Sequence, residues 1–92
     1  MIYEYIRLYE RQLAAGEHPE RWNITHPAVV EKIHRDYFDA GSNIVNTNTF
    51  GANSLKFAPE ELKAVIKAAL ENAKRARESS SGPQEKFIAL DI

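Results

Sequence analysis

The sequence predicts an α/β fold with parallel strands, in the order helix, helix, strand, helix, strand. Three observations favour this class: a strand-forming segment at 43–49, a long amphipathic helix beginning at Pro59, and a short apolar segment, KFIALDI, at 86–92. A strand, a helix and a second strand in this order form a right-handed parallel crossover. Two parallel strands rarely make a stable sheet. We therefore expect a piece of a larger parallel α/β fold, or a chain that completes itself by oligomerising.

The composition is that of an ordinary globular protein. The chain has 92 residues, 43% of them hydrophobic, and a formal net charge of −1, which allows one small domain. This charge balance gives no electrostatic basis for binding nucleic acid or an acidic membrane. No apolar segment approaches the ~20 residues that span a bilayer. The absence of cysteine excludes disulfides, thiolate metal ligands and a cysteine nucleophile within these residues. We expect a cytoplasmic protein.

The first expected element is a helix over residues 1–15, which Gly16 can end. Its apolar side chains recur at spacings of four, three and four residues, as on one face of a helix. These side chains are Ile2, Ile6, Tyr9 and Leu13. We expect this face to pack on the rest of the chain or on a partner chain. Residues 17–25 then form a connector, with Trp22 and Ile24 as its apolar anchors.

Two further helices flank the first strand. One is capped by Thr25 or His26, has Pro27 in its first turn, and ends at Gly41. The other begins at Pro59, with acidic side chains in its first turn and basic side chains in its last turns. This distribution of charge is favourable to the helix dipole. The apolar stripe of the helix that begins at Pro59 consists of Leu62, Val65, Ile66, Ala69, Leu70 and Ala73.

The segment between these helices, NIVNTNTFGAN at 43–53, is the most informative part of the sequence. Ile44 and Val45 begin a strand, and small and polar residues follow until Gly51 breaks the pattern. In an α/β protein, ligands bind at the carboxyl ends of parallel strands. The segment therefore predicts a strand that delivers hydrogen-bonding groups to a site. The alternative is a polar strand end followed by a surface turn. The polar side chains are Asn46, Thr47, Asn48 and Thr49.

The histidines give little support for a metal site. His26 and His34 lie eight residues apart and can share one side of a helix, but no third ligand accompanies them. We favour the alternative of a histidine at the helix start and a histidine on the helix surface.

Three blocks of the sequence resemble the homocysteine S-methyltransferase family, which includes the N-terminal domain of cobalamin-dependent methionine synthase and betaine–homocysteine methyltransferase. The blocks are HPERWNITHPAVVEKIHRDYFDAGSNIV, NTNTFGAN and KFIALDI. The family typically shows P-E-x-W/L-N-x-T-H-P-x-V-V, then I-H-x-x-Y-x-x-A-G-A-D-I, then T-N-T-F-G-A-N, which is the most specific motif. The resemblance covers residues 17–92 and leaves 1–16 as a divergent N-terminal helix.

The resemblance implies a partial (β/α)8 TIM barrel. It also implies methyl transfer to the thiolate of homocysteine, or a similar small thiol, giving methionine. In the family a zinc ion held by three cysteines keeps the sulfur deprotonated. Matching the motifs residue by residue places six residues on the substrate face. Two of them, Phe50 and Gly51, would shape the pocket rather than react. The set is Thr47, Asn48, Thr49, Phe50, Gly51 and Asp91.

Several departures from the family pattern bear on activity. The family begins with a strand carrying a D-G-x-x-G-T motif that binds homocysteine, whereas residues 1–16 lack it. The zinc cysteines of the family lie beyond residue 92, and a whole barrel needs ~250 residues. We therefore expect no cofactor or metal in this chain, and no methyl transfer by the chain alone. The alternative function is a non-catalytic, oligomerising interaction module, or one chain of a barrel assembled from separate chains.

Overall fold

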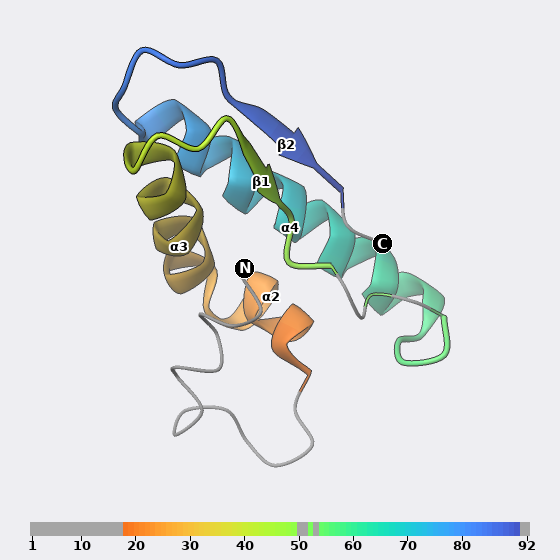
Figure 1. Cartoon of the computed structure of the whole chain (residues 1–92). Helices are drawn as coiled ribbons and strands as arrows, with labels where there is room; N and C mark the ends of the chain where they lie inside the picture. The colour runs from red at the N-terminus through yellow and green to blue at the C-terminus, as the bar shows by residue number, and fades with distance from the viewer. Residues whose placement is uncertain (1–17, 50–51, 53, 91–92) are drawn as a thin grey trace.

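The computed structural model describes residues 18–49, 52 and 54–90 (Figure 1). It is a small α/β arrangement of helices and two parallel strands, compatible with part of a barrel. The elements are η2 (Pro19–Arg21), α2 (Trp22–Thr25), α3 (Pro27–Asp39), β1 (Ile44–Asn46), α4 (Pro59–Ser79) and β2 (Phe87–Ala89). The helix predicted over residues 1–15 lies outside the described residues. No helix in the described ranges combines the length and the apolar character needed to cross a membrane.

The two strands pair in parallel, as predicted. Their register is Ile44 with Phe87, Val45 with Ile88, and Asn46 with Ala89. The Phe87 N–H donates to the Asn43 carbonyl at 2.6 Å, and the Thr47 N–H donates to the Ala89 carbonyl at 2.9 Å. α4 connects the strands and lies on one side of both of them (Figure 1). Each strand has three residues, so both are shorter than the sequence predicts.

The boundaries predicted for the two long helices are confirmed. Pro27 and Pro59 occupy their first turns, where the missing N–H leaves no intrahelical bond unmade. His26 is the N-cap residue of α3, but no side chain hydrogen-bonds to the start of that helix. Gly41 follows α3 with a φ of +105°, a conformation that residues with a side chain rarely adopt. The turn from α3 into β1 therefore depends on glycine.

The apolar core lies between the helices and on the helix-facing side of the sheet. Its buried side chains on α4 are small apart from one valine, and small side chains let neighbouring elements pack closely. The buried apolar residues are Trp22, Val30, Ile33, Phe38, Val45, Ala52, Phe57, Val65, Ala69, Ala73 and Ala76.

Three expectations about local structure and burial are wrong. Residues 17–25 are more than a connector, because they contain η2 and α2. Trp22 is buried as expected, but Ile24 is 48% exposed. The second strand is not covered on both faces, since Phe87 is 53% exposed and its paired residue Ile44 is 58% exposed. Side chains alternate between the faces of a strand, so the face opposite the buried Val45 is open.

Candidate functional site

Three polar residues follow β1 at its carboxyl end, where β2 also ends. Thr47, Asn48 and Thr49 are each no more than 1% exposed. The hydroxyl oxygens of Thr47 and Thr49 lie 2.7 Å apart and share a hydrogen bond. The Thr49 N–H donates to the Thr47 carbonyl at 2.9 Å, so the chain turns tightly here. The predicted site residues Phe50, Gly51 and Asp91 lie outside the described residues.

Buried asparagine side chains join this strand end to two helical segments. The Asn23 amide nitrogen, on α2, donates to the Asn48 carbonyl at 2.7 Å and to the Glu20 carbonyl at 2.9 Å. The Asn48 amide nitrogen donates to the Pro19 carbonyl at 2.9 Å. From α4, the Asn72 amide nitrogen donates to the Asn23 carbonyl at 3.0 Å. All three asparagines are 1% exposed. They form a continuous set of hydrogen bonds from α4 to the end of β1.

Sequence reasoning missed Asn72 and placed His34 on the helix surface, which is wrong. Asn72 lies three residues after the buried Ala69, on the apolar face of its helix. A polar residue at such a spacing was the signal that could have indicated a buried, hydrogen-bonded side chain. His34 is 1% exposed because it lies four residues after Val30 and four before Phe38, both fully buried. Burial lowers the pKa of His34 to about 4. The ring is therefore neutral at physiological pH.

The donor set does not fit the zinc ion that the resemblance implies. The sequence contains no cysteine. No group of three or more histidine, aspartate or glutamate side chains that could hold a metal occurs within residues 18–49, 52 and 54–90. The polar side chains at the end of β1 are neutral amides and hydroxyls. These groups bind and orient a ligand through hydrogen bonds, but they supply neither a thiolate nor a base that titrates near neutral pH.

Comparison with known proteins defines the class of this chain. The sequence profile of homocysteine S-methyltransferase matches residues 5–92. The chain therefore belongs to the homocysteine S-methyltransferase family. It is similar to the methionine synthases of Mycobacterium tuberculosis and Mycobacterium leprae, with 61% identity to each over 31 residues. That stretch covers 34% of this chain and 3% of each relative, so the match spans a small part of their length. No solved structure matches the chain.

Proposed function

We propose that the chain supplies part of the homocysteine-binding face of a methyltransferase that converts homocysteine into methionine. Family membership supports the substrate class. The observation that carries the proposal is the cluster of buried hydroxyl and amide groups at the carboxyl end of β1, the position where parallel α/β folds bind ligands. In this proposal the fold is a segment of a (β/α)8 barrel. The binding residues are Thr47, Asn48, Thr49, Phe50, Gly51 and Asp91.

The proposal gives these residues binding and orientation, and gives none of them a catalytic step. Homocysteine carries an ammonium and a carboxylate, which hydroxyls and amides can bind as acceptors and donors. A thiol with an ordinary pKa of ~8.5 is mostly protonated at neutral pH, so methyl transfer needs a group that favours the thiolate. Because these 92 residues contain no cysteine to hold zinc, the proposal assigns that group to residues outside them. We also propose a cytoplasmic location, with which the absence of cysteine is consistent.

Titration of the ¹⁵N-labelled chain with L-homocysteine tests this proposal. We expect the amide signals of Thr47, Asn48 and Thr49 to move, and to move less with L-homoserine, which has a hydroxyl in place of the thiol. Thr49→Val keeps the side-chain shape but removes the hydroxyl that pairs with Thr47. In this proposal the Thr49 hydroxyl also hydrogen-bonds to homocysteine, and the loss of that bond should weaken binding about 10-fold. Thr25→Val, at an exposed position on α2, should leave the affinity within about two-fold.

Two outcomes would contradict parts of this proposal. If homocysteine moves none of the signals from the end of β1, the binding assignment is wrong. If the purified chain transfers a methyl group to homocysteine without any added protein, the division between binding here and thiol activation elsewhere is wrong.

A second candidate function is supported by the open face of the sheet. Ile44 and Phe87 are paired neighbours that are 58% and 53% exposed, and Leu90 beyond β2 is 44% exposed. Neighbouring exposed apolar side chains mark interaction surfaces. The alternative is therefore an interaction module that joins a second copy or a complementing chain through this face. Light scattering over a concentration series should show association that Phe87→Lys abolishes and that Leu55→Lys, at a 95% exposed position, leaves unchanged. A monomer at every concentration would exclude self-association.

A further inference from the structure

The backbone beyond β1 leaves the sheet at a defined point. The Thr47 N–H still donates to the Ala89 carbonyl of β2 at 2.9 Å. One residue later, the Asn48 carbonyl accepts a hydrogen bond from the side chain of Asn23 at 2.7 Å. A side chain on α2 therefore takes over from the neighbouring strand as the hydrogen-bonding partner of the chain. The carbonyl of Asn48 thus points at the amide of Asn23 and away from β2.

The amide of Asn23 is itself held in place. Its nitrogen also donates to the Glu20 carbonyl, at 2.9 Å, which fixes the side chain against the turn of η2. The backbone carbonyl of Asn23 accepts from Asn72 at 3.0 Å. The Asn48 amide nitrogen returns a bond to the Pro19 carbonyl at 2.9 Å. The two segments are thus joined by hydrogen bonds in both directions, and each bond joins buried groups.

The cost of these asparagines shows that packing alone does not account for them. The side-chain oxygens of Asn23 and Asn48 are buried, and no group in the described part of the chain hydrogen-bonds to them. A buried acceptor left unpaired costs roughly 1–3 kcal/mol, so an apolar side chain of similar size would fill the same space with less penalty. The N–H groups, which hold backbone carbonyls at defined places, are what an apolar residue could not replace.

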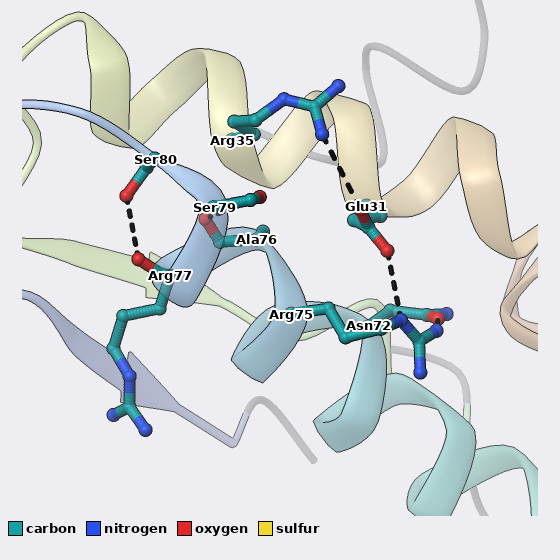
Figure 2. A network of polar contacts seen from close by, with 8 residues as sticks. All are labelled: Glu31, Arg35, Asn72, Arg75, Ala76, Arg77, Ser79 and Ser80. Carbon is teal, nitrogen blue, oxygen red and sulfur yellow. Dashed lines mark hydrogen bonds and ion pairs between the residues drawn. The ribbon is translucent and has the colours of Figure 1, made fainter.

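The same set of hydrogen bonds continues to the surface of the molecule. The Asn72 oxygen accepts from the Arg75 guanidinium, and Arg75 also donates to Glu31 on α3 at 2.9 Å. Figure 2 shows Glu31 between Arg75 and Arg35, so that α3 and α4 are bridged next to Asn72. Asn72 therefore holds α2 from a helix that is itself bridged to α3.

We infer that Asn23 is a positioning residue for the substrate-binding segment: its amide orients the Asn48 peptide, and through it the hydroxyls of Thr47 and Thr49. The inference rests on the proposed function, because it deepens the assignment of that segment to homocysteine. The two hydroxyls belong to the residues directly before and after Asn48, and their oxygens lie 2.7 Å apart. Rotation of that peptide would separate them. Asn23 acts through Asn48 and is not assigned a contact with homocysteine.

Nuclear magnetic resonance of the 92-residue chain tests the inference. In the wild type, the Asn23 side-chain amide should exchange slowly with solvent and show a through-hydrogen-bond coupling to the Asn48 carbonyl carbon. Asn23→Asp keeps the shape of the side chain but replaces the N–H donor with a carboxyl group, which cannot donate once it is ionised. We expect this variant to shift the Asn48 carbonyl signal and the Thr49 amide signal, and to weaken homocysteine binding about 10-fold. The loss should deepen as rising pH ionises the new carboxyl.

The control variant is Thr25→Ala, which removes an exposed side chain from the same short helix. It should leave the Asn48 carbonyl signal in place and the homocysteine affinity within about two-fold. Asn72→Ala is a second test variant, which removes the bond to the Asn23 carbonyl but leaves the Asn23 amide intact. It should shift the Asn48 carbonyl signal by less than Asn23→Asp does.

The outcomes separate the positioning role from the proposed function. If the wild type shows no coupling between Asn23 and Asn48, and the Asn23 amide exchanges freely, the positioning role is overturned even if no variant folds. An unchanged Asn48 carbonyl signal in a folded Asn23→Asp chain overturns it as well. If homocysteine does not bind the wild type, the proposed function fails and the positioning role toward homocysteine fails with it. In that case the coupling and the carbonyl shift still establish whether Asn23 orients the peptide.

Discussion

The two faces of the small sheet differ in how completely they are covered. On the helix-facing side, Val45 is 4% exposed and Phe38 of the neighbouring helix is fully buried. On the other side, Ile44 and Phe87 each expose more than half of their surface. Ile44 and Val45 are adjacent in the chain and both β-branched, so composition does not explain the difference. In the part of the chain that the structure describes, helices pack against the Val45 side of the sheet, and the side of Ile44 and Phe87 stays exposed.

The largest expected effect comes from making the same substitution on both sides. Phe38→Ala removes a fully buried ring and should lower the free energy of unfolding by about 3–5 kcal/mol. Phe87→Ala removes a ring that is already 53% exposed, and should cost about 1 kcal/mol or less. Urea unfolding followed by circular dichroism measures both changes at one low protein concentration.

This pair of variants can also break the comparison. Equal costs for the two substitutions would mean that the sheet is covered on both faces in solution. A cost for Phe87→Ala that grows with protein concentration would show that another copy of the chain covers the open face. That second result would favour the interaction module described above.

The next largest effect concerns His34, which lies on the covered side. Its pKa in the folded protein is lowered to about 4 by burial, from 6.5 in the unfolded chain. Between these values the unfolded chain binds the proton more readily. Stability is therefore fully present above pH 6.5 and falls as the pH decreases toward 4, by about 1.4 kcal/mol per unit and roughly 3 kcal/mol in all.

His34→Gln provides the control for this pH dependence, because glutamine does not titrate. Urea unfolding of both proteins at pH 7, 6 and 5 gives two slopes, and the difference between them isolates the imidazole from the carboxylates. A difference near zero would mean that water reaches His34, and that the helix-facing side is less completely covered than the structure indicates.

The sequence predicted those features that depend on neighbouring residues. The ends of α3 and α4 follow from Pro27, Gly41 and Pro59, and their buried faces follow from apolar spacing. Burial of the strands was not predictable in the same way, because Phe87 has the character of a core residue and only its packing partners decide whether it is covered. The contact between Asn23 and Asn48 joins residues 25 apart in the chain. It could be foreseen only after α2 and the end of β1 had been placed side by side. The substrate role of Thr47–Thr49 remains a prediction from their position.

The smallest effect concerns the edge of the covered side, where charged groups join α3 to α4 (Figure 2). Glu31 accepts from Arg75 at 2.9 Å and from Arg35 at 3.4 Å, and its side chain is 24% exposed. Glu31→Gln should cost about 0.5–1 kcal/mol, because one carboxylate serves two partners in a partly buried place. Asp36→Asn, the matched change on the same helix, removes a Lys32 pair whose side chains are 50–59% exposed, and should cost less than about 0.5 kcal/mol.

Salt sharpens this last comparison. Raising sodium chloride to about 1 M shortens the screening length to about 3 Å, which weakens exposed ion pairs more than partly buried ones. The cost of Asp36→Asn should then vanish, while part of the cost of Glu31→Gln remains. If Glu31→Gln and Asp36→Asn cost the same at low salt, and both costs vanish at high salt, the Glu31 bridge is as solvated as the Lys32 pair. The covered side of the molecule would then consist of the apolar core and Asn72, and the charged groups of Glu31, Arg35 and Arg75 would belong to the solvated surface.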